Sequence, residues 1–270
     1  MTWTMFKHIN YFVILTLLII IGCSSASERD YERGKAYSQQ KKYQEALQLF
    51  EQAILRNEKK EVSLKAAVDG SRVSFFEVKD FKKAVWFYEQ IILLSKNQEE
   101  RLDAQKKLAL IFFEQLNDYE NAVIEINKTI PFIKNDSELY KYKIFLAKSY
   151  FYLGNFGQSE MEINDLINKK LSEDDKFQLL TLKANNYLSR KENEKAAQVF
   201  KEIFDKNPKR ALEENIAMAL AVSYEELKDY KKAIQVLESI KPSHPHPDII
   251  EIKIKRLLER QKNQPKGQKK

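Results

Sequence analysis

The sequence predicts an all-α solenoid, in which pairs of helices stack one after another along the chain. The first observation is a small residue that returns every 37–38 residues, followed each time, four positions later, by a bulky apolar or aromatic residue. The second is a scarcity of helix breakers, with six Gly and six Pro in 270 residues. Six copies at a fixed period predict six helix pairs, because one pair alone cannot bury its apolar face. The small residues are Ala46, Ala84, Ala122, Ser159, Ala196 and Ala233, and the bulky ones are Phe50, Tyr88, Ile126, Ile163, Phe200 and Leu237.

Short polar turns mark the boundaries between helices, and the repeats are expected to cover residues 30–246. Turn-forming residues occur at Lys79-Asp80, Asn117-Asp118, Gly154-Asn155 and Lys228-Asp229. The pattern of residues 247–262 predicts one more helix, which caps the last pair with an apolar face that contains Ile250. The solenoid therefore ends in a terminal helix whose other faces are basic.

The positive charge is concentrated at the C-terminal end of the chain. Residues 252–270 carry eight Lys and Arg against Glu259, which equals the whole net charge of +7. The repeats are therefore neutral overall, and nucleic-acid binding, which requires a basic stripe on a folded surface, is not expected. Residues 263–270 lack apolar side chains and are predicted to be a basic disordered tail. The tail either keeps this end soluble or contacts an anionic polymer or headgroup.

Residues 1–22 are predicted to be a lipoprotein signal peptide. Lys7 and His8 form a short basic region, and the apolar run 9–21 that follows is shorter than the roughly 20 residues needed to span a bilayer. Ile20-Ile21-Gly22-Cys23 resembles the lipobox of bacterial lipoproteins, so Cys23, the only cysteine, is the predicted lipidation site. The alternatives are an uncleaved membrane anchor and a lone buried cysteine.

Cleavage before Cys23 would leave residues 23–29 as a short lipid-anchored tether. From Ser24 onward this tether measures roughly 20 Å when fully extended, so the first repeat is expected close to the bilayer. Ser24, directly after the cysteine, resembles an outer-membrane address. The expected location is the cell envelope, with the chain lipid-anchored to the outer membrane and facing the periplasm.

No catalytic, cofactor or metal site is expected. Beyond the signal peptide the sequence has two histidines, His244 and His246, in a Pro-rich turn, and a metal site would need further ligands within reach. The sequence has no Gly-rich phosphate-binding loop. The acidic clusters at Glu99-Glu100 and Glu173-Asp174-Asp175 fall at predicted helix starts, where the helix dipole favours them without catalysis. We therefore expect a protein that is not an enzyme.

The repeats resemble the tetratricopeptide repeat (TPR), in which a helix A is followed by a helix B. Repeat 1 has small residues of this family at Gly34 and Ala46 and an aromatic one at Tyr43. Repeats 2 and 3 fit better with one extra turn residue, and repeat 2, with Ser71 and Ser74, is the weakest copy. The resemblance covers about residues 27–246. It implies a right-handed superhelix whose A helices line a concave groove.

The resemblance also implies which side chains face a ligand in that groove. Lys148 and Asn185 are of types that can hold the carboxylate or backbone of a peptide. The aromatic residues of repeat 4 are expected to be mostly core, with an aromatic peptide-binding groove as the alternative. Carried onto repeats 3, 4 and 5, the groove positions are Lys106, Leu110, Phe113, Lys141, Ile144, Lys148, Phe151, Tyr152, Gln178, Thr181, Asn185, Leu188 and Ser189.

Architecturally, the chain resembles the TPR lipoproteins of outer-membrane protein assembly and of type IV pilus biogenesis. This resemblance implies an adaptor that binds other proteins through the groove and the membrane through the lipid on Cys23. Its setting would be an envelope assembly of the outer-membrane, pilus or secretion type. The alternatives are a regulator of cell-wall or polysaccharide enzymes and a homo-oligomeric structural protein.

Overall fold

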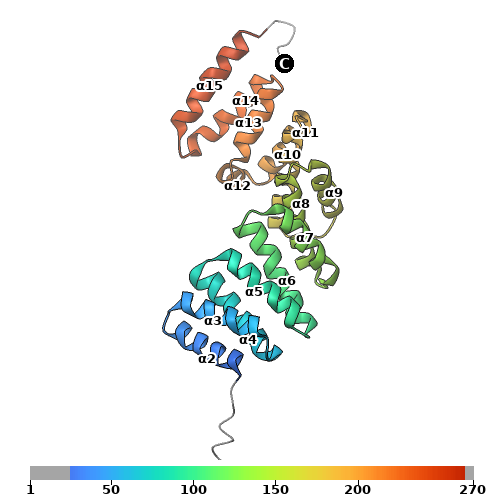
Figure 1. Ribbon diagram of the computed structural model, residues 1–270. Coiled ribbons are helices and arrows are strands. Elements are labelled where there is room, and N and C mark those ends of the chain that lie inside the picture. The colour runs from blue at the N-terminus through green and yellow to red at the C-terminus, as the bar shows by residue number, and fades with distance from the viewer. Residues whose placement is uncertain (1–24, 265–270) are drawn as a thin grey trace, which may run out of the picture. The chain divides into compact units, whose positions relative to one another are not determined.

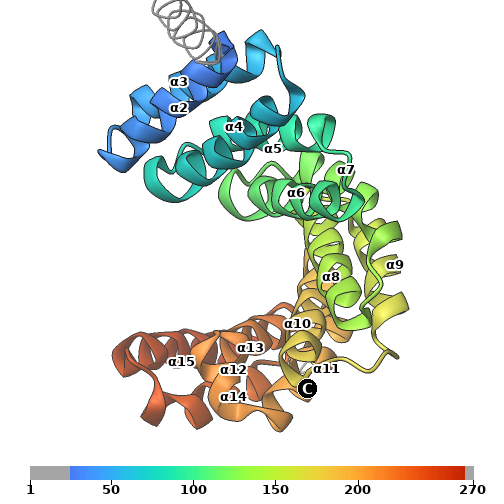
Figure 2. The same cartoon turned by 90° about the horizontal axis from the view of Figure 1, so that it is seen from below.

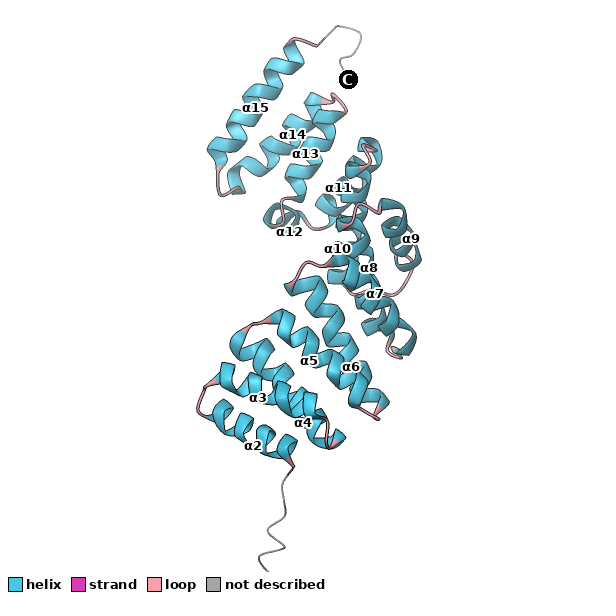
Figure 3. Ribbon diagram, viewed as in Figure 1, coloured by secondary structure: helices cyan, strands magenta, loops and turns pink. Residues whose placement is uncertain are grey.

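The computed structural model describes residues 25–264, and within this range all regular secondary structure is helical. The described chain is all-α, as the repeat pattern predicts, and within each of its two units consecutive helices pack on one another (Figures 1 and 3). The chain divides into two compact units, with the division between Leu116 and Asn117, and each unit is described here by itself. The predicted signal peptide, the lipidation site Cys23 and residues 265–270 of the basic tail lie outside the described residues.

Unit 1 contains five α-helices, each of which packs on the next (Figure 2). The A helices of the second and third repeats each continue into a π-helical turn. In chain order the elements are α2 (Ala26–Gln39), α3 (Tyr43–Arg56), α4 (Lys60–Arg72), η1 (Val73–Val78), α5 (Phe81–Leu94), α6 (Gln98–Leu110) and η2 (Ile111–Gln115).

The first helix starts earlier than the sequence suggested. Residues 23–29 were expected to be a tether, but α2 begins at Ala26. Ser25 caps it, because its hydroxyl accepts from the Glu28 N–H while the Glu28 carboxylate accepts from the Ser25 N–H. This reciprocal capping box satisfies two backbone donors that would otherwise be unpaired at the helix start. Only Ser24 therefore separates Cys23 from the folded repeats.

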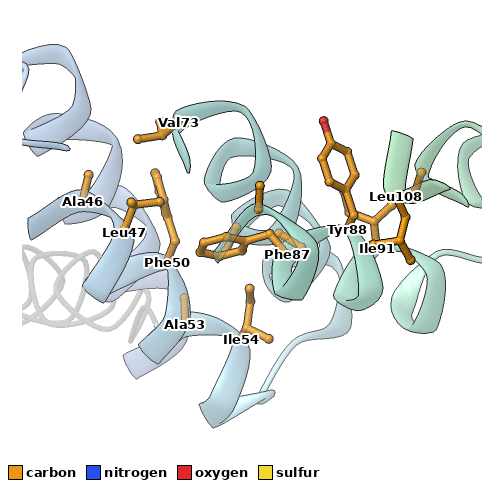
Figure 4. Close-up of a cluster of buried hydrophobic side chains, with 14 of the residues drawn as sticks. Ala46, Leu47, Phe50, Ala53, Ile54, Val73, Phe87, Tyr88, Ile91 and Leu108 are labelled. Carbon is orange, nitrogen blue, oxygen red and sulfur yellow. The ribbon is translucent and has the colours of Figure 1, made fainter. Parts of the chain in front are cut away.

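Close helix crossings organise the core of unit 1. Ala46 and Ala84 are fully buried, and Phe50 and Phe87 fill the spaces beside them in a single hydrophobic cluster (Figure 4). A methyl group added to Gly70 would lie 2.2 Å from the Phe87 ring. Gly70, rather than Ser71 or Ser74, is thus the small residue that permits the A–B crossing in repeat 2.

The extra residue of repeats 2 and 3 lies at the end of the A helices rather than in the turns after them. In repeat 2, the N–H of Asp80 donates to the carbonyl of Ser74, six residues earlier. In repeat 1 the equivalent bond runs from Lys42 to Tyr37, five residues earlier. The π-helical turns η1 and η2 therefore absorb one residue each, because a π turn holds one residue more than an α turn.

Unit 2 contains the remaining nine α-helices. Its last three α-helices, α13, α14 and α15, also pack in sequence (Figure 2). In chain order the elements are α7 (Tyr119–Thr129), η3 (Ile130–Phe132), α8 (Asp136–Tyr152), α9 (Phe156–Leu166), α10 (Glu173–Ser189), α11 (Asn193–Lys206), α12 (Pro208–Glu213), α13 (Ile216–Glu226), α14 (Tyr230–Ile240), η4 (Lys241–Ser243) and α15 (Pro247–Lys262).

The A helix of the sixth repeat is split, which the sequence pattern did not predict. Pro208 stands at the first position of the short helix α12, where its missing N–H leaves no hydrogen bond unmade. Asn215 then adopts a left-handed conformation, with φ of 60°, and separates α12 from α13. The break separates the short helix α12 from α13, the longer part of this A helix.

All six turns between an A helix and its B helix share one conformation. A left-handed residue stands two positions before each B helix, and the residue between them is the N-cap. In four of the turns the N-cap N–H donates to a tyrosine carbonyl five residues earlier, as in a Schellman motif. The left-handed residues are Lys41, Lys79, Asn117, Gly154, Lys191 and Lys228.

The terminal helix α15 covers the last repeat. Ile250, Ile254 and Leu257 are buried in one cluster with α13 and α14. On the neighbouring surface, Arg256 and Arg260 both donate to the carboxylate of Glu225 on α13. The helix is thus held by an apolar face and by paired guanidinium groups. Within residues 25–264, no helix is both long and apolar enough to cross a bilayer.

Candidate functional site

Unit 2 contains a pocket of about 390 Å³ between three of its helices. Lys148, Phe151 and Tyr152 come from α8. The α10 residues Gln178, Thr181, Leu182 and Asn185 form a second wall, and Arg210 and Glu214, from α12 and its C-cap, form the third. Six of these nine residues are among the groove positions expected from the sequence. The structure brings together Lys148, Phe151, Tyr152, Gln178, Thr181 and Asn185.

Lys148 is the half-buried cation of the pocket. Its Nζ donates to Oε1 of Gln178 at 2.6 Å, and among the described residues no carboxylate forms an ion pair with it. Burial lowers the pKa of Lys148, while the more distant carboxylates of Asp174, Asp175 and Glu214 oppose this shift. The ammonium group therefore keeps donor capacity for a ligand acceptor, because it has three N–H donors and one is used by Gln178.

Arg210 is already neutralised by its neighbours. Its Nη2 donates to Asp174 at 2.7 Å and its Nε to Glu214 at 2.6 Å, while its guanidinium carbon lies 3.8 Å from the centre of the Phe177 ring. The hydrogen bonds from Arg210 and Gln178 lower the pKa of Asp174. Arg210 thus serves chiefly to hold α12 against α10, and Lys148 remains the cation without a carboxylate partner.

The apolar side of the pocket consists of Phe151, Tyr152 and the buried Leu182. Tyr152 is 55% exposed, and its ring stacks on that of Tyr119 with the ring centres 4.5 Å apart. The Thr181 hydroxyl is buried and has no hydrogen-bond partner within the described chain. The pocket therefore offers an exposed aromatic surface beside a small number of polar groups, which is the usual composition of a ligand site.

Seven expected groove residues are absent from the pocket lining. Ile144 is only 3% exposed and packs in a core cluster with Ala147 and Ile163, because it lies on the face of α8 that contacts its neighbours. Leu188 packs against another core cluster, and Lys141 is exposed with its ammonium 5.8 Å from the centre of the Phe145 ring. Ser189 is the last residue of α10, and the other three, Lys106, Leu110 and Phe113, lie on α6 and η2 of unit 1.

Three lining residues, Leu182, Arg210 and Glu214, were missed by the sequence analysis. Leu182 directly follows the predicted Thr181 and reads as a core residue from its apolar character alone. Arg210 and Glu214 come from the split A helix of repeat 6, and the groove positions predicted from the sequence cover only repeats 3, 4 and 5. The Asn207-Pro208 pair marked a helix start, but nothing in the local pattern signalled the second break at Asn215.

The described chain shows no constellation for metal binding. No group of three or more His, Cys, Asp or Glu side chains within residues 25–264 is arranged to hold a metal ion. The rings of His244 and His246 lie 6.3 Å apart, and the His244 ring nitrogen accepts from the His246 backbone N–H, so this pair stabilises its own turn.

Comparison with known proteins agrees with this architecture. Family models described as tetratricopeptide repeat match residues 31–60 and 187–253. A tetratricopeptide repeat protein from Parabacteroides merdae ATCC 43184 has a similar structure, with a TM-score of 0.53 and 13% identity over 88% of this chain and 89% of that one. PilW, a type IV pilus biogenesis factor, has a TM-score of 0.51 and 12% identity over 84% of this chain and 99% of that one. No curated protein matches the sequence.

Proposed function

The chain is a tetratricopeptide repeat protein, and from this premise we propose that it is a lipid-anchored scaffold for an envelope protein assembly. Proteins of this fold are typically non-catalytic interaction scaffolds, so a partner protein is the expected ligand. The unit 2 pocket is its candidate docking site. The observation that carries this proposal is the half-buried Lys148, without a carboxylate partner, beside the exposed aromatic ring of Tyr152.

The pocket chemistry suits a peptide segment of a partner protein. A backbone or side-chain carbonyl, or a carboxylate, accepts from the Lys148 ammonium, and the Asn185 amide both donates and accepts. An apolar side chain of the same segment packs on Phe151 and Tyr152. Interfaces rely on such combinations of an aromatic anchor and a few well-placed polar groups.

The envelope location rests on the sequence of the N-terminal region. The basic start, the apolar run and the Ile20-Ile21-Gly22-Cys23 motif support export and acylation of Cys23. Several acyl chains together hold a protein firmly on a membrane, whereas one chain alone binds reversibly. We place the scaffold on the periplasmic face of the outer membrane, where it would recruit or position components of an outer-membrane, pilus or secretion assembly.

The test is affinity isolation of the lipidated full-length protein from its native membrane in mild detergent, followed by mass spectrometry. Envelope proteins should co-purify reproducibly, and they should be lost with Lys148→Ala and with Tyr152→Ala. Both side chains line the pocket, and Tyr152 is exposed enough that its removal should leave the core intact.

Matched controls remove the same kinds of groups outside the pocket. Lys176→Ala removes an exposed cation from α10, and Met161→Ala removes a largely exposed apolar side chain from α9. Neither should change the co-purifying proteins. Recovery of the protein alone would contradict a stable scaffold. Recovery with glycan would favour a regulator of cell-wall enzymes, and recovery with further copies of itself would favour a structural homo-oligomer. A Cys23→Ala variant that remains in the membrane fraction would contradict lipid anchoring.

A further inference from the structure

The start of the folded chain is fixed rather than loosely attached. Beyond the capping box, the backbone N–H of Ser27 donates to the carboxylate of Glu58 at 3.1 Å, and Ser27 is fully buried. The Ser25 and Ser27 hydroxyls are 2.9 Å apart and share a hydrogen bond. These contacts join the first turn of α2 to the connection between α3 and α4.

Two ion pairs strengthen the same junction. Lys59 Nζ lies 2.8 Å from Glu28 Oε2, and Arg56 Nε lies 2.6 Å from Asp30 Oδ2. The Asp30 side chain is largely buried, so the Arg56 pair is shielded from solvent on one side. The first turn of α2 and residues 57–60 therefore form one edge of unit 1, which we call the N-terminal edge.

This edge has almost no freedom to move away from Cys23. Two residues of fully extended chain cover at most about 7 Å, which is the limit on the distance between the Cα atoms of Cys23 and Ser25. The headgroup layer on each side of a bilayer is of similar thickness, roughly 5–8 Å. An acylated Cys23 lies at the boundary of the acyl chains, so Ser25 must lie at the level of the headgroups.

We propose that the N-terminal edge of unit 1, formed by Ser25–Glu28 and residues 57–60, rests directly on phospholipid headgroups. This inference relies on the acylation of Cys23 proposed above. It adds that unit 1 has a defined membrane-facing side, instead of swinging on a flexible linker. Gln40, at the other end of α2, then lies about 21 Å from the edge along the helix axis, because α2 has 14 residues.

The charges of the edge are compatible with this surface. Lys60 is exposed, and within residues 25–264 no ion pair forms at its ammonium group. Lys59, by contrast, is held by Glu28, and Glu58 is held by Ser27. Because cations and anions are interspersed, the acyl chains supply most of the membrane affinity and the edge determines orientation.

The test uses single fluorescent labels on the full-length, lipidated protein in phospholipid vesicles that carry a headgroup-attached quencher. Cys23 is the only cysteine, so an introduced cysteine is the only free thiol once Cys23 is acylated. Lys60→Cys places the label on the N-terminal edge, and Gln40→Cys places it at the far end of α2, where the side chain is also exposed.

The Lys60 label should be strongly quenched and the Gln40 label should not. A protein that is anchored and labelled but equally quenched at both positions, or at neither, would overturn the inference. Absence from the vesicles would instead mean that Cys23 is not acylated, which contradicts the proposed anchor and is detected separately by flotation and by intact mass.

A variant with a longer linker provides an independent test of the same inference. Ten Gly and Ser residues inserted between Ser24 and Ser25 add a flexible span of roughly 17 Å. Anchoring should persist, because Cys23 and its preceding residues are unchanged, but most of the quenching at Lys60 should be lost. Retained quenching with the linker would show that another feature of unit 1 binds the membrane and would overturn the role given to the short connection.

Discussion

The size of single residues at the A–B crossings decides how closely the helices of unit 1 approach. Gly34 faces the Phe50 ring and Gly70 faces the Phe87 ring, and a Cβ at either position would come closer than normal contact distance. Gly70 is the more crowded, because a Cβ there would lie 2.2–2.5 Å from three atoms of the Phe87 ring. Each phenylalanine thus fills a space that exists only because its partner lacks a side chain.

Substitution Gly70→Ala should destabilise unit 1 by roughly 1–3 kcal/mol, the usual cost of overfilling a packed core. The added Cβ would lie 2.2 Å from Phe87 Cε1, so the ring or the helix must shift. Chemical denaturation followed by circular dichroism measures the change. Gly157→Ala is the matched control: a Cβ there meets nothing within 4 Å, and Ala should stabilise α9 by up to about 1 kcal/mol. An unchanged midpoint for Gly70→Ala would contradict the close crossing.

The sequence predicts the residue pattern of the repeats, but it predicts only part of the pocket lining. All six small residues, from Ala46 to Ala233, are fully buried, because a strict spacing and small size leave few other structures. The pocket needed geometry that spacing does not encode. Ile144 had the right repeat position but the wrong face, and Arg210 became a lining residue only through the break at Asn215.

At the scale of elements, each A–B turn has a residue in the left-handed conformation at the same position. Lysine occupies the left-handed position in four of the six turns and glycine in only one, Gly154. A residue with a Cβ pays roughly 1–2 kcal/mol for this conformation, whereas glycine adopts it freely. The turns are therefore places where the natural sequence is less stable than it could be.

Lys191→Gly should raise the stability of unit 2 by about 0.5–1 kcal/mol, and Gly154→Ala should lower it by about 1 kcal/mol or more. Lys191 is exposed with φ of 61°, and Gly154 has φ of 75° with open space around its Cα. Packing is thus unaffected in either case, so the difference isolates backbone conformation. Thermal unfolding of the two variants measures it, and a change of the same sign in both would refute this account of the turns.

The first turn of α2 should loosen at acidic pH. Hydrogen bonds, first from the Ser27 backbone N–H, lower the pKa of Glu58 below its usual value, and a hydrogen bond from Lys59 does the same for Glu28. A carboxylate whose pKa is lowered by folding stabilises the folded state above its unfolded pKa. That contribution is lost as the pH falls through the lower, folded pKa.

Amide hydrogen exchange, corrected for the intrinsic pH dependence, should show protection of Ser27 and Glu28 decreasing between about pH 6 and pH 3. The Glu58→Gln substitution removes the charge but keeps an acceptor oxygen. In this variant, protection of the Ser27 and Glu28 amides should be lower at pH 6 and should vary less with pH. Asp165→Asn is a control substitution at a carboxylate of unit 2, which pairs with Lys143. Equal pH dependence in Glu58→Gln and the natural protein would exclude Glu58 as the cause.

The element boundaries show where sequence reasoning stops. The turns at Lys79-Asp80 and Asn117-Asp118 were placed correctly, because an N-capping Asp marks a helix start. A change of period in the sequence indicated the extra residue of repeats 2 and 3, but it did not indicate where in the repeat this residue lies. An α turn and a π turn use the same residue types, so only the bond from Asp80 to Ser74 distinguishes them.

At the scale of the whole molecule, stability is expected to be a sum of contacts between neighbouring helices. Outside the sequence-adjacent pairs, helix contacts in both units involve elements only a few positions apart, such as α2 with α4 and α11 with α13. In such arrays, a substitution that destabilises one repeat mainly affects the repeats that contact it directly. The protein can therefore open locally at its C-terminal end while unit 1 remains folded.

The Leu257→Ala substitution tests whether the C-terminal end opens locally. Leu257 is buried between α15 and the last repeat, and removal of such a leucine costs about 2–5 kcal/mol. Because the terminal helix has a neighbour on one side only, the loss should appear as faster hydrogen exchange in α14 and α15. Amides of α2–α5 should keep their natural rates.

Phe200→Ala is the comparison. Phe200 is fully buried in the cluster that joins α10, α11 and α13, so its removal should accelerate exchange on both sides of α11. Mass spectrometry of peptides from each helix distinguishes the two patterns. Faster exchange throughout the chain in Leu257→Ala would mean that the repeats unfold as one cooperative block. The terminal helix would then stabilise the whole scaffold, including the membrane-facing edge, rather than only the repeat on which it packs.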